Sequence, residues 1–127
     1  MEARMRIVWI VDDDDEMSHA VTLMLKLLDC SVETFRDARS AAQKLLAGGR
    51  PELIVLDINM PEVTGIDMLE FLKMRPDLKH IPVVMLSSET TDAQVDEAMK
   101  LGANAFVFKP VTLEELEAAI NKAVASQ

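Results

Sequence analysis

Short apolar runs alternate with helix-like patterns along the whole chain. Five runs rich in β-branched residues predict strands at 7–11, 31–35, 53–56, 83–86 and 105–108. Each run is followed by a segment in which apolar residues recur every three or four positions, the period of one helix face. Five strands that alternate with five helices predict an α/β domain with parallel strands and right-handed crossovers.

Capping signals mark where several of the helices begin and end. Thr91 and Thr112 each stand three residues before a Gln or Glu, which is the spacing of a capping box. Gly48 and Gly102 are typical of the residue that follows a helix, and Pro76 marks the end of the third one. The predicted helical segments are 17–28, 38–47, 64–74, 91–102 and 112–124.

The polarity of each strand predicts its place in the sheet. The runs at 7–11, 53–56 and 83–86 are apolar without alternation, as expected for strands covered on both faces. The run at 31–35 alternates, which favours an edge. We therefore predict a flavodoxin-like (βα)5 three-layer sandwich with a parallel five-stranded sheet of order 2-1-3-4-5. The length suits a single domain over 1–127, with no output domain in this chain.

Composition narrows the ligands and the surroundings. The chain has 13 Lys and Arg against 22 Asp and Glu, a formal charge of −9 and a pI near 4.6. This balance argues against nucleic acid and against an anionic membrane surface. One cysteine, Cys30, and the lack of an apolar run of about 18 residues favour a cytoplasmic protein. With 4% aromatic residues, methionines should fill the core, and Met68 and Met74 are candidates for exposure.

Side chains that can bind ligands or take part in catalysis follow four of the five predicted strands. Asp12 and Asp13 follow the first strand, Asp57 the third, Ser87 the fourth and Lys109 the fifth. In an open parallel sheet, ligands bind beyond the carboxyl ends of the strands, where the strand order reverses. We therefore expect these five side chains to form one site.

Three carboxylates at one site need a counterion. Like charges a few Å apart raise one another's pKa, and a hard divalent cation removes that conflict. Mg²⁺ prefers a few carboxylates together with water and phosphate oxygens, and Mn²⁺ accepts the same ligands. A lysine beside such a cation is a point charge suited to a phosphoryl oxygen.

Four motifs carry a resemblance to a known family. They are VDD at 11–13, LDINMP at 56–61, MLSS at 85–88 and FKP at 108–110. In their order and spacing, over almost the whole chain, they resemble the CheY-like receiver domain of two-component response regulators. The resemblance implies a phosphorylation-dependent signalling switch rather than an enzyme acting on other molecules. Its phosphodonor would be a sensor histidine kinase or a histidine phosphotransfer protein.

The resemblance also implies roles for the residues of the site. Asp57 would be the phosphoacceptor and Lys109 would bind a phosphoryl oxygen. Asp13 and Asp57 would ligate Mg²⁺ directly, with Asn59 contributing its main-chain carbonyl and Asp12 acting through water. The receiver would catalyse only its own phosphorylation and dephosphorylation.

The same resemblance predicts how the signal leaves the site. The Ser87 hydroxyl would move to the phosphoryl group, and Phe106, at the position of the switch aromatic, would rotate inward behind it. Asn59 and Glu89 match positions that tune the lifetime of the acyl phosphate. The last two helices and the last strand would then form the face that controls a downstream partner.

The charge of the C-terminal third predicts the chemistry of that partner. From residue 89 to 127 the chain has seven acids against Lys100, Lys109 and Lys122. The partner surface should therefore be basic or mixed. Asn104 and Ala105, with a last helix free of Arg, lack the charge pattern by which winged-helix regulators dimerise, so we expect a monomer or a weak dimer.

Several polar residues near the site have simpler structural roles. The acids at 14–16 suit the first turn of a helix, where they bind free amides and favour the helix dipole. An EF-hand loop from Asp12 fails, because it would need Gly at Met17 and Glu at Leu23. His19 should be an exposed helix residue. Cys30 should be a small apolar residue at the start of the second strand.

Two rival functions remain open at this point. A Mg²⁺-dependent phosphohydrolase with an aspartyl nucleophile also uses an Asp at a strand end, but its D-x-D signature would need an acid at Asn59. A receiver-like interaction module that is not phosphorylated is the other. The intact set of five site residues disfavours it.

Overall fold

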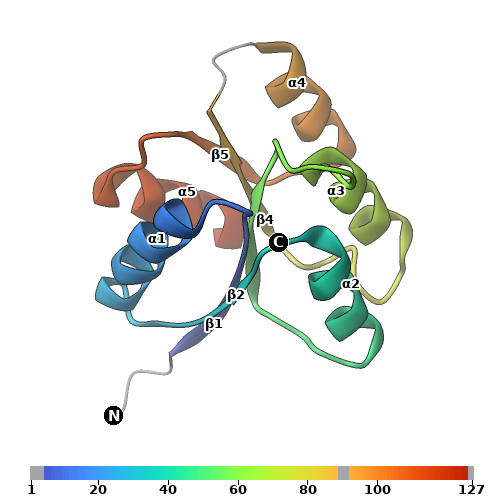
Figure 1. The fold of residues 1–127 in the computed structure, drawn as a ribbon, viewed down its shortest axis with the longest axis horizontal. Helices are drawn as coiled ribbons and strands as arrows, with labels where there is room; N and C mark the ends of the chain where they lie inside the picture. Colours follow the sequence, from blue (N-terminus) through green and yellow to red (C-terminus); the bar gives the residue numbers. More distant parts are fainter. Residues whose placement is uncertain (1–4, 89–91, 126–127) are drawn as a thin grey trace.

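The computed structural model describes residues 5–88 and 92–125. Five strands and five helices alternate strictly along the described chain (Figure 1). The strands are β1 (Arg6–Val11), β2 (Cys30–Phe35), β3 (Leu53–Asp57), β4 (Val83–Ser87) and β5 (Ala105–Phe108). The helices are α1 (Asp15–Leu27), α2 (Ala38–Leu46), α3 (Gly65–Met74), α4 (Asp92–Leu101) and α5 (Leu113–Ala125).

All paired strands are parallel, and their order is β2-β1-β3-β4-β5. The predicted flavodoxin-like topology is therefore confirmed. Figure 1 shows α1 and α5 on one side of the sheet and α2, α3 and α4 on the other. The strand order reverses between β1 and β3, because β1 pairs with β2 on one side and with β3 on the other.

Two apolar clusters, one on each face of the sheet, explain the apolar runs without alternation. In β1, Val8 and Ile10 belong to the cluster beneath α1 and α5. Trp9 and Val11 belong to the cluster beneath α2, α3 and α4. Every residue of β3 and β4 is buried. Because both faces are covered, each strand position meets apolar neighbours whichever way its side chain points.

The caps of the helices agree with most of the sequence signals. Asp14 caps α1, accepting hydrogen bonds from the amides of Glu16 (3.0 Å) and Met17 (3.2 Å). The Thr112 hydroxyl accepts from the amide of Glu115 at 3.2 Å and donates to the carboxylate of the same residue at 2.9 Å. The capping box predicted at Thr91 lies outside the described residues.

Several smaller predictions can also be compared with the structure. Gly48 and Gly102 follow α2 and α4 with φ angles of 107° and 110°, conformations that favour glycine. Cys30 is buried at the start of β2, as predicted. Met74 is 80% exposed, but the prediction that Met68 is a candidate for exposure was wrong, since it is 1% exposed inside the sheet–helix interface.

Candidate functional site

Three carboxylates meet at the carboxyl edge of the sheet. β1 ends at Val11 and delivers Asp12 and Asp13, while Asp57 is the last residue of β3. β1 and β3 are neighbours in the sheet, so the ends of both strands lie side by side. One carboxylate oxygen from each of the three residues lies within 4.8 Å of the others. The predicted cluster is therefore present.

Lys109 joins this cluster from the end of β5. Its Nζ lies 3.2 Å from Asp12 Oδ2 and 3.4 Å from Asp57 Oδ1. Both carboxylates are almost fully buried, at 1% and 2% exposure, whereas Asp13 is exposed. One ammonium group therefore faces three carboxylates, and the site keeps an excess of negative charge. The peptide bond between Lys109 and Pro110 is cis.

The pKa values of Asp57 and Lys109 are both raised, but by different causes. Burial, followed by repulsion from Asp12, raises the pKa of Asp57 from its ordinary value of 3.8 to about 6, although Lys109 opposes the rise. Burial works against the charge of Lys109, but the Asp57 and Asp12 carboxylates outweigh it and raise the pKa of its ammonium. At neutral pH the Lys109 ammonium is therefore charged. The Asp57 carboxylate is also ionised, but its ionisation costs free energy.

The oxygens at this site fit a divalent cation. Asp12 Oδ1 accepts a hydrogen bond from the amide of Asp14 at 3.0 Å. Asp12 Oδ2 is buried and ion-paired to Lys109, yet it accepts no hydrogen bond of regular geometry. The site therefore offers a cation the buried Oδ2 of Asp12, which can accept a further contact, together with the exposed carboxylate of Asp13. The excess of negative charge also favours a cation. Hard oxygen donors of this kind are those that Mg²⁺ and Mn²⁺ prefer.

Ser87 lies next to this cluster, on β4. It is fully buried, and its carbonyl accepts a hydrogen bond from the amide of Lys109 at 2.8 Å, which ties the ends of β4 and β5 together. Asn59 donates from Nδ2 to Ser88 Oγ at 3.4 Å, so the loops after β3 and β4 are in contact. Glu89 lies outside the described residues.

Phe106 is the predicted site residue that the structure places away from the carboxylates. Its ring is 37% exposed and packs edge-on against Phe108, with the ring centroids 5.2 Å apart. Phe106 pairs in register with Met85, and Phe108 with Ser87. The aromatic therefore lies on the same pair of strands as Ser87 but points to the surface in this conformation.

The neighbouring acids lie at the start of α1, as predicted, and Asp14 is the one that accepts hydrogen bonds from free amides there. Asp14 is the cap of α1, and Asp15 forms an exposed ion pair with Arg36 at 3.3 Å. His19 is exposed on α1. Within the described residues, the carboxylates of Asp12, Asp13 and Asp57 form the one group with the spacing of a metal site.

Gly65 is a site residue that the sequence patterns missed. It is the first residue of α3, and its amide donates to the carbonyl of Ile58 at 3.0 Å. A Cβ atom at this position would lie 2.1 Å from the carbonyl oxygen of Asp57. Only a residue without a side chain lets α3 start against the backbone of Asp57. A Gly eight residues after the strand-end Asp is the signal that could have indicated this contact.

Replacing Gly65 with Ala should destabilise the fold and disturb Asp57. The methyl group must push α3 away from the end of β3, and overpacking of this kind costs about 1–3 kcal/mol. We expect chemical denaturation to show a loss of about 2 kcal/mol. Gly48→Ala is the control, because nothing lies within 4 Å of its Cβ position and only backbone strain from the positive φ, about 1 kcal/mol, is expected. Equal losses in the two variants would contradict the contact.

Asp57→Asn should stabilise the protein in the absence of divalent cations. A pKa raised from 3.8 to about 6 corresponds to roughly 3 kcal/mol against the ionised carboxylate. The native state therefore binds the proton more tightly than the unfolded chain, and stability falls as pH rises through this range. At pH values above 7, Asn should raise the free energy of unfolding by about 2 kcal/mol.

The advantage of Asn should shrink as pH is lowered towards 4, where the wild-type carboxyl is protonated. Millimolar Mg²⁺ should stabilise the wild type more than the variant, because a cation offsets the repulsion. Thermal unfolding at several pH values, with EDTA or Mg²⁺, measures both effects. A variant that is less stable than wild type with EDTA above pH 7 would contradict the electrostatic description.

The chain resembles characterised proteins over most of its length. Residues 8–121 match the family described as Response regulator receiver domain. The chain is 35% identical over 115 residues to "Chemotaxis protein CheY" of Pseudomonas aeruginosa, covering 91% of this chain and 93% of that protein.

Solved structures agree with the sequence matches. The chemotaxis protein CheY4 of Vibrio cholerae has a TM-score of 0.85 and 30% identity, covering 94% of this chain and 99% of that one. The Mn²⁺-bound form of the response regulator Rcp1 has a TM-score of 0.78 and 30% identity, covering 91% and 90%. Among the described residues, no helix is long and apolar enough to cross a membrane.

Proposed function

The chain belongs to the response regulator receiver domain family of two-component signalling, and we propose on this basis that it is a switch turned on by phosphorylation of Asp57. One observation carries the proposal. Asp57 ends β3 beside a second buried carboxylate, an exposed one and the ammonium of Lys109. Receiver domains typically act as signalling switches rather than as enzymes, and we infer that this one catalyses only its own phosphorylation and dephosphorylation.

The chemical step is a phosphoryl transfer to a carboxylate. An Asp57 oxygen attacks the phosphorus of a phosphohistidine on a sensor histidine kinase or a histidine phosphotransfer protein. A P–O bond forms and the P–N bond breaks, and its electron pair stays on the imidazole nitrogen, which takes up a proton. The attacking carboxyl must be ionised, and a pKa of about 6 leaves most of it ionised at cytoplasmic pH.

A divalent cation, Mg²⁺ or Mn²⁺, completes the proposed site. Asp13, Asp57 and the main-chain carbonyl of Asn59 would hold it directly, and Asp12 would hold it through water. When bound, the cation neutralises charge on the carboxylates and on the phosphoryl oxygens. The spare acceptor capacity of the buried Asp12 Oδ2 and the net negative charge support this assignment.

Lys109 and Ser87 would bind oxygens of the phosphoryl group once it is bonded to Asp57. Lys109 already contacts Asp57 at 3.4 Å, so its ammonium can donate to an oxygen of a group bonded to that carboxylate. Ser87 is buried one strand away and tied to Lys109 through the backbone. We propose that its hydroxyl turns towards the phosphoryl group. Asn59, and Glu89 outside the described residues, would tune how long the acyl phosphate lasts.

The outgoing signal would pass through β5. Movement of Ser87 opens space on the paired strand, and Phe106, exposed in this conformation, turns inward to fill it. The face formed by α4, β5 and α5 then changes shape and controls a downstream protein. Exposed acids on both helices, among them Glu97 and Glu114, favour a basic or mixed partner surface.

Phosphorylation should change the surroundings of the Phe106 ring. With fluorophenylalanine at all four Phe positions, the ¹⁹F resonance of Phe106 should move towards that of a buried ring when phosphodonor and Mg²⁺ are added. Phe106→Leu assigns the resonance. Phe35, buried in β2 at the opposite edge of the sheet from β5, is the internal control and should not move. An unchanged Phe106 resonance in fully phosphorylated protein would exclude this ring as the switch.

We further propose that residues 1–127 act as one receiver domain in the cytoplasm, without direct contact to nucleic acid or membrane, as a monomer or weak dimer. A phosphohydrolase is the second candidate, but Asn59 stands where its second acid is required. Incubation with Mg²⁺ and a small phosphodonor distinguishes the two. A receiver gains one phosphoryl group per chain, whereas repeated turnover of phosphomonoesters would establish the hydrolase. Failure to gain the group from any small donor or partner kinase would refute the switch.

A further inference from the structure

Basic side chains gather at the end of the molecule opposite the carboxylate site. The carboxylates lie at the carboxyl ends of the strands, whereas this second surface lies at the start of β4 and at the end of α3. We call it the basic pole and define it by its charged residues. They are Arg50, Lys73, Arg75, Asp77 and Lys79. Four bases thus accompany one acid, in a chain that otherwise has far more acids than bases.

Contacts between these residues make the basic pole one surface. Arg50 Nη2 lies 3.1 Å from Asp77 Oδ2, and Arg75 Nε lies 3.7 Å from Asp77 Oδ1, so a single carboxylate serves two guanidinium groups. Lys73 donates from Nζ to the carbonyl of Lys79 at 3.1 Å. Because the acceptor is a backbone carbonyl, this contact does not neutralise the charge of the Lys73 ammonium. The positive charge of the surface is therefore only partly neutralised from within.

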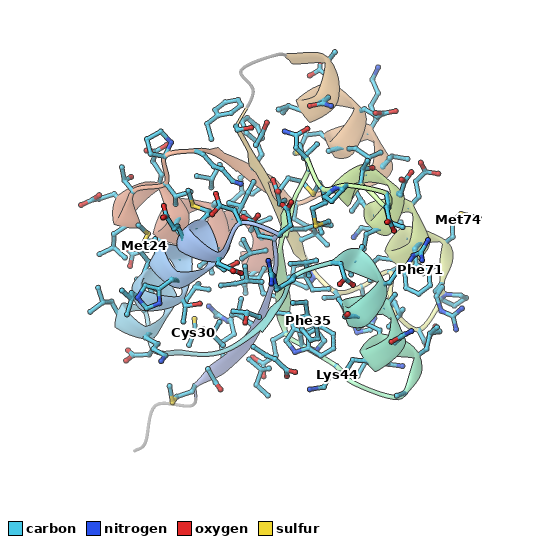
Figure 2. The ribbon with its side chains drawn as sticks, viewed as in Figure 1. Met24, Cys30, Phe35, Lys44, Phe71 and Met74 are labelled. Atoms are coloured by element: carbon cyan, nitrogen blue, oxygen red, sulfur yellow. The ribbon has the colours of Figure 1, made fainter. Side chains whose placement is uncertain are left out.

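An apolar projection and a hollow lie within this positive surface. Met74, at the end of α3, is 80% exposed between Lys73 and Arg75, and Figure 2 shows it at the outer edge of the molecule beyond Phe71. The guanidinium of Arg75 lies over the ring of Phe71, 5.6 Å from its centroid. A hollow of about 570 Å³ adjoins Arg50. Its lining is mixed, with Arg6, Glu52 and His80 beside Pro51, Ile81, Pro82 and Val124.

We propose that the basic pole is a docking surface for an acidic protein segment with apolar side chains. Met74 supplies apolar contact, and the surrounding bases supply charge complementarity to Asp and Glu. The Asp77 carboxylate within the surface, together with the formal charge of −9, opposes a nucleic acid or an anionic membrane. An acidic protein segment carries few charges at defined places and avoids that repulsion.

The location of the basic pole gives the interaction a distinct use. A partner bound there leaves the carboxyl ends of the strands open to a phosphodonor and leaves the face of α4, β5 and α5 open as well. The partner would therefore hold the receiver in place whether or not Asp57 is phosphorylated. Binding should be the same for wild type and Asp57→Asn, which separates this inference from the proposed function.

The test is an NMR titration of the full ¹⁵N-labelled chain with a short synthetic peptide of Glu and Asp with interspersed Leu. We expect amide shifts to concentrate at Arg50 and over 73–80, with an affinity that weakens as salt rises. The double variant Met74→Glu with Lys79→Glu should bind about tenfold more weakly. Both side chains are exposed, so the fold should tolerate the changes.

Leu23→Glu with Lys26→Glu is the matched control. It makes the same change in charge and apolar area at exposed positions of α1, and it should bind the peptide like wild type. Shifts scattered over basic residues elsewhere, equal weakening by both double variants, or no binding would overturn the proposal. So would tighter binding at the same residues by a DNA duplex or by vesicles of anionic lipid.

Discussion

Asp57→Asn should abolish stable phosphorylation of this protein. After incubation with Mg²⁺ and a small phosphodonor, intact-mass measurement should show one added phosphoryl group on the wild type and none on the variant. Asn replaces the nucleophilic carboxylate with an uncharged amide but keeps the size of the side chain, at a position that is 2% exposed. A folded variant is expected, because Asn also removes a carboxylate that burial and Asp12 make costly to ionise.

The matched control for this variant is Asp37→Asn. Asp37 also follows a strand, β2, and caps α2 by accepting a hydrogen bond from the amide of Ser40 at 2.7 Å. Asn caps helices as well as Asp does, so the fold should be unaffected. This variant should gain the phosphoryl group at the wild-type rate. Equal phosphorylation of Asp57→Asn and wild type would mean that another residue is the acceptor.

Lys109→Met should weaken both the fold and the phosphoryl transfer. The ammonium contacts two buried carboxylates, at 3.2 and 3.4 Å, and its loss leaves both without a counterion. Removing one partner of a buried ion pair costs about 3–5 kcal/mol, and Met keeps the length and apolar stem of Lys. Because Lys109 is partly exposed, we expect a loss of about 3 kcal/mol at neutral pH in EDTA.

The pH dependence of this loss identifies its cause. The raised pKa of Lys109 means that its ammonium stabilises the fold at neutral pH, where Asp57 is ionised, and that this contribution is lost as pH rises through the folded-state pKa of Lys109. The Asp57 carboxylate becomes protonated as pH falls below about 6, so the part of the loss that comes from Asp57 should diminish there. Chemical denaturation at pH 7.5 and pH 4.5 measures this. A loss independent of pH would indicate a packing defect instead.

Lys109→Met should also slow phosphorylation by about 10²-fold or more, the usual effect of removing one electrostatic contact to developing charge. Lys109→Arg keeps the charge and should retain most of the stability. Lys122→Met, on the exposed surface of α5, is the control for loss of a lysine and should change neither property. A wild-type phosphorylation rate in Lys109→Met would exclude Lys109 from contact with the phosphoryl group.

The fold and the core of the site could be predicted because local patterns encode them. The apolar runs of β1, β3 and β4 lack alternation since both faces of the sheet are covered, and this property placed them at the centre. Once the strands were parallel, residues such as Asp12 and Asp57 had to meet at one edge. The strand limits differed only slightly, with Asp57 and Ser87 inside β3 and β4.

Some features depend on contacts that no local pattern contains. Gly65 matters because of its distance to the backbone of Asp57, which only the folded chain defines. The capping box of α3, formed by Thr64 and Asp67, was missed because the acid is Asp rather than Glu or Gln. The basic pole brings Arg50 to residues 73–80, which are far away in the sequence. The burial of Met68 was not predicted, because the face of α3 that packs against the sheet is defined only in the folded chain.

Whether Asp57 is the phosphoacceptor is decided by locating the phosphoryl group on the chain. Wild-type protein is phosphorylated with a small donor and Mg²⁺, the acyl phosphate is reduced with borohydride, and the modified residue is found by peptide mass spectrometry. We predict that the modification occurs at Asp57 alone. Modification at Asp12 or Asp13 in place of Asp57, or none in protein that receives a competent donor, would refute the assignment.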